Sequence, residues 1–351
     1  MTGAAANDRA GTVGTGDAAA AVADLLVATG IPVDRARISA RAIVLADVWG
    51  IASHGILRMP SYLQRIEAGG INVGARLRDV RRAGAVVAFD GEAGLGHWQV
   101  WHAVDVAVQL ARTQGVAVAA IGNSSHCGAL GVYAARIRAA GAAGMVLSNG
   151  PAAIPAPEGG QPLLSTSPVA GTAAPLGHGP VVDMALGAIT RGQIARHARA
   201  GEPLEAGRAF DARGEPTTDP VAALAGMIAP IGGPKGFALG YLFEALTGLV
   251  GPGLSLDVID PFSVEHGAQA QRVSHLVLVL RPDAVDLDGD AVSRLERLRA
   301  ATTASGGRVP GGERRLALEG TVQLEESLRA ELVAWARRVG ARTAERLLHG
   351  P

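Results

Sequence analysis

The chain contains a single cysteine, Cys127, among its 351 residues, so no disulfide can form within it. Chains without disulfides are typical of a reducing compartment, and the cytoplasm fits best. Residues 1–16 are small and polar and lack a basic start followed by an apolar run, which argues against a secretory signal peptide. We therefore expect a cytoplasmic protein.

An excess of charge of one sign and long apolar runs are also lacking. Lys plus Arg and Asp plus Glu number 32 each, so no basic surface for nucleic acid or an anionic membrane is indicated. The most apolar strand-like run, residues 274–280, is far too short to cross a bilayer. The composition, 48% hydrophobic and 18% charged, is typical of a compact globular enzyme, and the length predicts two structural units.

Two common ligand-binding signatures are missing as well. No GxGxxG follows the first predicted strand, and Gly94-Leu95-Gly96 is only a partial match, so an ordinary Rossmann domain is not expected. The nine histidines include no HExxH and no close carboxylate cluster. We therefore predict no catalytic metal.

The two ends of the chain show helical periodicity, whereas the middle alternates between strand and helix patterns. Apolar residues recur every three or four positions over residues 17–49, with a break at Gly30-Ile31-Pro32, which predicts a pair of helices. The order strand, helix, strand at 85–89, 98–113 and 116–121 predicts a β-α-β unit. Further helices are predicted at 62–68, 237–250, 290–300 and 324–348, and further strands at 144–147, 181–184 and 273–280.

This order predicts an α/β (α+β) fold of two domains. Residues 79–285 would form an α/β domain, inserted into a helical domain that residues 1–78 and 286–351 build together. The stretch 150–179 is dense in Pro, Gly and Ala and too long for a structureless loop. We expect it to contain ordered turns.

The first candidate site is His54, Arg58 and Tyr62, within the stretch GIASHGILRMPSY. If this stretch is helical, the spacing of four places all three side chains along one side, although Pro60 can kink it. Imidazole exchanges a proton near neutral pH, guanidinium holds a carboxylate through two hydrogen bonds, and phenol donates a hydrogen bond. An ordinary surface helix that carries a His and an Arg is the alternative interpretation.

The second candidate is GNSSHCG, which follows the strand predicted at 116–121. Polar residues at the carboxyl end of a strand often bind ligands in α/β sheets, which makes His126 a candidate. A polar turn with an incidental histidine is the alternative. A hydrolase that uses Ser125 or Cys127 is disfavoured, since no nucleophile-elbow pattern surrounds either residue. We interpret Cys127 as structural.

A third candidate is the glycine-rich turn GGPKGF before the helix predicted at 237–250. Backbone N–H groups at such a helix start bind anions, and Lys235 adds a positive charge. The turn is not a Walker A loop, because the glycine spacing and the Ser or Thr after the lysine are missing.

The ordered set of motifs resembles a known family. The segments are DVWGIASHGILRMPSY, GLGHW, GNSSHCGALGVY, SNGPAAIPAPEGG, VVDMALGAITRGQI, GGPKGFALG and VPGGERR. Over residues 17–315 the chain resembles the malate/L-lactate dehydrogenase family, which also contains sulfolactate dehydrogenase, ureidoglycolate dehydrogenase, diketogulonate reductase and the piperideine- and pyrroline-carboxylate reductases. The motifs are specific for the family and much less so for the substrate.

The resemblance implies a non-Rossmann nicotinamide-binding domain and a homodimer with its active site near the subunit interface. It implies NAD or NADP as the cofactor and a small carboxylate as the substrate, interconverted between its 2-oxo and 2-hydroxy forms. His54 and His126 match the family's acid–base candidates. Arg58 matches the arginine that grips the substrate carboxylate, with Tyr62 beside it. Asp183 is implied in cofactor contact and is considered as a group that orients a catalytic imidazole.

The resemblance also implies a set of cofactor-binding residues, among them the DMA segment and the KG pair. The set is Ser53, His126, Asn149, Thr166, Asp183, Met184, Ala185, Leu186, Arg191, Lys235, Gly236, Gly311, Gly312 and Glu313. Arg191 either meets a 2′-phosphate, which would favour NADPH, or is a solvated helix residue.

Several departures from the family pattern are present. The segment STSP at 165–168 stands where GTNP is usual, Pro234 replaces the aromatic residue before KG, and the late PGE turn carries an additional Gly. We expect an altered substrate or cofactor preference. Reduction of a cyclic or open-chain 2-imino acid is one alternative function. A catalytically silent binding or regulatory relative is another, supported by the STSP segment.

Overall fold

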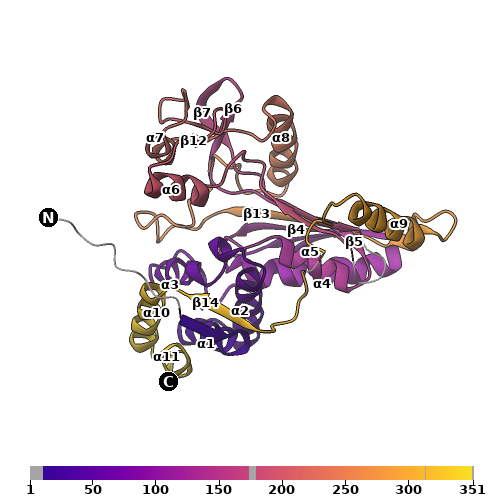
Figure 1. Cartoon of the computed structure of the whole chain (residues 1–351). Helices are drawn as coiled ribbons and strands as arrows, with labels where there is room; N and C mark the ends of the chain where they lie inside the picture. The colour runs from indigo at the N-terminus through magenta and orange to yellow at the C-terminus, as the bar shows by residue number, and fades with distance from the viewer. Residues whose placement is uncertain (1–10, 174–178, 313, 350–351) are drawn as a thin grey trace.

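The computed structural model describes residues 11–173, 179–312 and 314–349. Both ends of the chain lie in one helical body (Figure 1), made of α1 (Thr15–Ala28), α2 (Val33–Val48), α3 (Met59–Glu67), α10 (Glu326–Val339), α11 (Arg342–His349), β1 (Gly11–Gly14) and β14 (Thr321–Leu324). In this body α1 packs along α2 and against α11, and β1 pairs antiparallel with β14. The turn after α1 includes Gly30, whose φ of 99° favours glycine.

A seven-stranded sheet lies beside the helical body. Its strands are β2 (Arg78–Ala83), β3 (Val86–Asp90), β4 (Val116–Ser124), β5 (Ala143–Ser148), β8 (Val169–Ala173), β9 (Val181–Met184) and β13 (Val273–Leu280). The order is β2-β3-β4-β13-β5-β8-β9. β3 and β4 are parallel and are joined by α4 (Gly96–Gln114), whereas the other neighbours pair antiparallel. The predicted β-α-β unit is therefore confirmed, and β13 separates β4 from β5.

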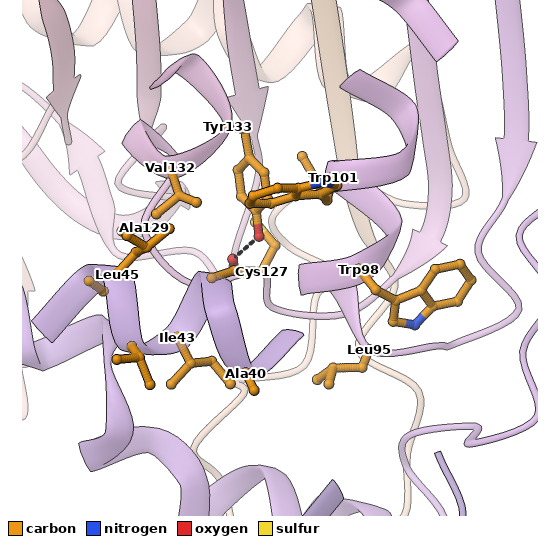
Figure 2. Packing of buried hydrophobic residues seen from close by; sticks show 14 of the residues in the cluster. Ala40, Ile43, Leu45, Leu95, Trp98, Trp101, Cys127, Ala129, Val132 and Tyr133 are labelled. Carbon is orange, nitrogen blue, oxygen red and sulfur yellow. Dashed lines mark hydrogen bonds between the residues drawn. The ribbon is translucent and has the colours of Figure 1, made fainter. Parts of the chain in front are cut away.

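One face of the sheet is covered by α4 and α5 (Gly131–Ala139). Side chains from these helices and from α2 share one buried cluster, and Figure 2 shows Ile43 and Leu45 opposite Trp101 and Tyr133. The Tyr133 hydroxyl donates a 2.5 Å hydrogen bond to the Cys127 carbonyl, drawn as a dashed line in Figure 2. The core therefore runs without interruption from the helical body to the sheet.

The opposite face of the sheet is partly open. Directly paired residues share a face, so Leu278, Met145, Gly171 and Val182 form one row across four strands. Leu278, Met145 and Val182 remain 38–39% exposed, as does Met184 further along β9. We call these four exposed apolar residues and Gly171 the open sheet face.

A third region lies above this face (Figure 1). It contains β6 (Ile154–Ala156), β7 (Gly159–Leu164), β10 (Ala209–Phe210), β11 (Pro216–Thr217), β12 (Met227–Ile228), α6 (Arg191–Ala200), α7 (Pro220–Ala225) and α8 (Pro234–Gly248). Its buried clusters are small and separate from the main core. Of its elements, α8 contacts β13 and β5 and thus lies nearest the sheet.

The C-terminal quarter departs from expectation. The region predicted as helical at 324–348 forms two helices, because β14 ends at Leu324 and Gly340, with a φ of 79°, separates α10 from α11. The 3-10 turn η3 (Pro282–Ala284) and α9 (Ala291–Ala304) follow β13. Although predicted within the helical domain, α9 is drawn apart from that helical body in Figure 1, and it buries none of its residues. No helix within the described ranges is both long and apolar enough to span a bilayer.

Candidate active site

His54 and Arg58 lie on two 3-10 turns, η1 (Ala52–His54) and η2 (Ile56–Arg58), rather than on the single helix considered from the sequence. Asp47, near the end of α2, accepts a 2.8 Å hydrogen bond from the Ile56 N–H. A Cβ at Gly55 would lie 2.2 Å from that carboxylate, so the turn needs glycine there. Burial raises the pKa of Asp47 to about 7.

The two turns direct His54 toward His126, which follows β4 in the chain. Their rings stack with centroids 5.7 Å apart and an interplanar angle of 25°. The hydroxyl oxygen of Tyr62, on α3, lies 2.7 Å from His126 Nδ1. The Gln271 side-chain oxygen accepts the His126 N–H at 2.8 Å. The structure thus brings together two histidines and a tyrosine that the sequence analysis singled out on separate motifs.

Arg58 lies at the edge of this group. Its Nε donates to the Ser53 carbonyl at 2.6 Å, and its guanidinium carbon is 3.9 Å from the centroid of the Phe262 ring. Within the described ranges neither Nη group has a hydrogen-bond partner. The Ser53 hydroxyl is 2.9 Å from His54 Nδ1, so Ser53 contacts both the arginine and the histidine.

His97 completes the group, and sequence reasoning missed it. It lies at the start of α4, fully buried, with its ring edge-on to Tyr62 at 5.1 Å and to His126 at 6.3 Å between centroids. Neither ring nitrogen has a partner among the described residues. Its place in the GLGHW motif, at a helix start, was the available signal. We call His54, His97 and His126 the imidazole cluster.

Burial sets the protonation of the imidazole cluster. The pKa of His54 is lowered to about 4, mainly by desolvation and to a smaller extent by the charge of Arg58. Burial lowers the pKa of His97 to about 3. Burial and the neighbouring imidazoles hold the pKa of His126 well below its usual value. All three imidazoles are therefore neutral at pH 7.

The thiol and serine alternative fails on geometry. Cys127 is 3% exposed, burial raises the pKa of its thiol, and its sulfur lies 3.8 Å from His275 Nδ1 rather than next to His126. The Ser125 hydroxyl donates to the Gly94 carbonyl at 2.9 Å. Neither side chain is placed as a nucleophile beside His126.

Asp183 lies half-buried on β9, away from these contacts. Its carboxylate accepts a hydrogen bond from the Gly131 N–H at the start of α5 and lies 3.8 Å from Arg314 Nη1. Burial raises its pKa. It contacts no imidazole in the described part of the chain, so the role considered for it, orienting a catalytic imidazole, has no support.

Two of the expected cofactor residues serve as backbone links. The Asn149 side chain accepts from the Ser274 N–H at 2.8 Å and donates to the Gly253 carbonyl at 3.3 Å. The Thr166 carbonyl accepts from the Leu186 N–H at 2.7 Å, and Leu186 itself is buried. Of the DMA segment, Met184 is exposed on the open sheet face and Ala185 follows it at the end of β9.

The glycine-rich turns hold close backbone contacts. A Cβ at Gly236 would lie 1.8 Å from the Ile231 carbonyl, and one at Gly311, whose φ is 55°, would lie 2.2 Å from the Val181 carbonyl. Gly312 is in the same turn as Gly311, whereas Glu313 lies outside the described residues. Lys235 is exposed in the first turn of α8.

Arg191 has a structural task in the third region. Its guanidinium donates to the Leu224 carbonyl at 2.7 Å and to the Gly226 carbonyl at 2.9 Å, so it holds the end of α7. These two bonds fix the orientation of the guanidinium that was considered for a 2′-phosphate contact, and they leave Nε and one N–H on each Nη group. Among the residues that the structure describes, no three His, Cys, Asp or Glu side chains are grouped to hold a metal ion.

Comparison with known proteins shows the family to which the chain belongs. The model of the malate/L-lactate dehydrogenase family matches residues 14–332. The chain is 38% identical over 319 residues to (2R)-3-sulfolactate dehydrogenase (NADP(+)) of Chromohalobacter salexigens, covering 89% of this chain and 94% of that protein. It is 32% identical over 326 residues to Δ1-pyrroline-2-carboxylate reductase of Ancylobacter novellus, covering 91% and 94%. The structure of sulfolactate dehydrogenase from Methanocaldococcus jannaschii superimposes with a TM-score of 0.86 at 27% identity, covering 94% of this chain and 98% of that one.

Proposed function

Because the chain belongs to the malate/L-lactate dehydrogenase family, we propose that it interconverts a 2-oxo acid and its 2-hydroxy acid with NAD or NADP. The observation that carries this proposal is the meeting of His54, His126 and Tyr62 beside Arg58. These residues supply proton exchange, a hydrogen-bond donor and an acid-binding group within one small volume.

His126 and His54 have different tasks in this proposal. The N–H of Gly128 points at His126 Nδ1 at 3.4 Å, so Nδ1 accepts, the Tyr62 hydroxyl donates to it, and neutral His126 carries its proton on Nε2. This Nε2–H polarises the substrate carbonyl oxygen. His54 exchanges the proton, and such general acid–base catalysis contributes roughly a hundred- to ten-thousand-fold.

Arg58 binds the substrate acid group and influences this proton exchange. Its two Nη groups match a planar carboxylate. Its positive charge is one cause of the low pKa of His54, so an anion bound to it offsets that effect and raises the pKa of His54. Substrate binding thereby lets the neutral imidazole take up the proton that reduction consumes.

The residues present fit a dinucleotide. The open sheet face offers flat apolar surface with glycine at its centre, and the start of α8 offers free backbone N–H groups and the exposed Lys235 for a diphosphate. When bound, the nicotinamide supplies or accepts the hydride. Met184 and Ala185 would line this surface, and Gly236 and Gly311 would keep the flanking turns close to it.

The domain and subunit arrangement belong to the same proposal. We assign cofactor binding to residues 79–285 and substrate binding by His54 and Arg58 to the helical domain of 1–78 and 286–351, from which α9 stands apart. A homodimer is supported by α8, on which Leu239 and Leu242 lie on one side, three residues apart, and are 42% and 52% exposed, since apolar helical faces of this kind are usually covered. We propose a cytoplasmic enzyme.

A second reaction deserves a direct test. The chain is similar over nearly its full length to a Δ1-pyrroline-2-carboxylate reductase, and an imine nitrogen presents the same demand for a proton beside a carboxylate. A panel of 2-oxo acids and cyclic 2-imino acids with NADH and NADPH, followed by nicotinamide absorbance, distinguishes the two. Turnover of no member of the panel would contradict the proposed function.

A further inference from the structure

Phe262, in the loop between α8 and β13, contacts two residues of the proposed active site. Its ring lies 3.9 Å from the guanidinium carbon of Arg58, and its centroid lies 5.4 Å from that of His126 at 69°. The side chain is 37% exposed, so it is not part of the hydrophobic core. We propose that Phe262 is a positioning residue that holds Arg58 for the substrate acid group, an inference that rests on the proposed function.

The loop that carries Phe262 is held by hydrogen bonds within the loop and from Arg65 on α3. The Asp260 carboxylate accepts the Phe262 N–H at 2.8 Å, which forms a tight turn at the ring. Arg65, buried on α3, donates to the carbonyls of His266 at 3.3 Å and of Gln269. A buried guanidinium from the helix that carries Tyr62 therefore fixes this loop over the active site.

The same loop is also tied to the other side of the cluster. Gln271, at the end of the loop, accepts the N–H of His126. Any shift of the loop would therefore disturb its hydrogen bonds to Arg65 on α3 and to the His126 N–H. The position of the Phe262 ring is therefore set by tertiary contacts on both sides, although the residue is 37% exposed.

The contacts of Arg58 determine which of its donors remain. Nε is bonded to the Ser53 carbonyl, and the Phe262 ring covers one face of the guanidinium. The edge that carries both Nη groups is left for a ligand. A carboxylate or a sulfonate reaches that edge with two oxygens, in the plane of the guanidinium. The ring thereby selects one direction of approach for the acid group.

The test compares Phe262→Leu, which keeps apolar volume but removes the aromatic face, with Phe262→Tyr, which keeps the ring. Loss of a cation–π contact and of side-chain order should raise the KM for the 2-oxo acid about fivefold in Phe262→Leu. We expect kcat and the KM for the nicotinamide to change less than about twofold. Phe262→Tyr should match the wild type.

Val264→Ala is the matched control, since Val264 is in the same loop and 83% exposed. A wild-type KM in Phe262→Leu would overturn the proposal. So would an equal rise in Phe262→Tyr, because that variant keeps the ring face. Thermal unfolding verifies that each variant is folded.

A binding measurement separates this inference from the proposed function. Calorimetric titration with oxalate, a dicarboxylate, measures the affinity of the acid-binding edge of Arg58 without turnover. Weaker binding by Phe262→Leu, by about the same factor of five, supports the positioning role even if no 2-oxo acid is reduced. Equal affinity in both proteins contradicts it.

Discussion

The imidazole cluster and the open sheet face differ in burial, polarity and origin. The cluster joins His54, His97 and His126 from three separate segments in a space where burial moves their pKa values far from the usual range. The open sheet face instead consists of apolar side chains on neighbouring strands, each more than a third exposed. Burial can change protonation, whereas an exposed apolar surface can bind a flat ligand. This difference is the basis of our proposal that the first region exchanges protons and the second binds the cofactor.

The largest effect is expected from His54→Ala. Removal of the proton-exchanging imidazole should lower kcat by roughly a hundredfold or more, while the dissociation constant of the nicotinamide changes less than about twofold. Steady-state kinetics and a fluorescence titration measure the two quantities. His102→Ala, at an exposed histidine on α4, is the control. Full activity of His54→Ala would remove this residue from the mechanism.

Arg58→Ala should mainly weaken the acid substrate. Loss of a charge-assisted hydrogen-bond pair is expected to raise the KM roughly tenfold or more. Arg58→Lys keeps the charge but loses the planar fork, so it should recover only part of the affinity. If Arg58→Ala instead weakened the nicotinamide and spared the acid, the assignment of the two regions would be reversed.

Met184→Asp tests the open sheet face. A carboxylate in the middle of an apolar cofactor surface should raise the dissociation constant of the nicotinamide about tenfold, with the KM for the acid little changed. Val80→Asp on the edge strand β2, at a residue 57% exposed, provides a control for added charge. Equal affinities of Met184→Asp and the wild type would place cofactor binding elsewhere.

The smallest effect concerns stability and pH. The pKa of His97 is about 3 in the folded protein and about 6.5 in the unfolded chain. Between these two pH values the unfolded chain therefore binds a proton that the folded protein does not bind. This contribution to the free energy of unfolding is present above pH 6.5 and is lost as the pH falls toward 3. Between pH 7 and pH 5.5, the free energy of unfolding of His97→Gln should therefore fall by about 1 kcal/mol less than that of the wild type. Denaturant unfolding at the two pH values measures it.

His102→Gln, at an exposed histidine on the same helix, is the control for the pH measurement. Identical acid sensitivity of His97→Gln and the wild type would mean that His97 is not held neutral by burial. The difference between the two pH values is compared, rather than stability itself, because Gln also changes packing around the ring.

Regular elements with strong periodicity were predictable. The strands β9 and β13 have the predicted bounds, and α1, α2, α4 and α8 lie within a few residues of expectation. Short or polar elements were not. β10, β11 and β12 have two residues each and carry no periodic pattern, and β2 (RDVRRA) is exposed throughout.

The candidate site was predictable only in part. His54, Arg58, Tyr62 and His126 were found because each lies in a motif of catalytic side chains. His97 carried a weaker signal, since one histidine at a helix start does not reveal that it is buried. Phe262 carried none, because the role we propose for it depends on where a loop more than 130 residues downstream of His126 is anchored.

By itself, the sequence determined the family, the reaction class and the chemical groups at hand, since ordered motifs and side-chain types can be read without coordinates. The tertiary structure decided how these groups act. It placed His126 Nδ1 against Tyr62, tied Arg191 to the end of α7, and moved Asp183 away from the imidazoles. Protonation and donor direction depend on burial and on neighbours distant in the chain, and only folding brings those neighbours together.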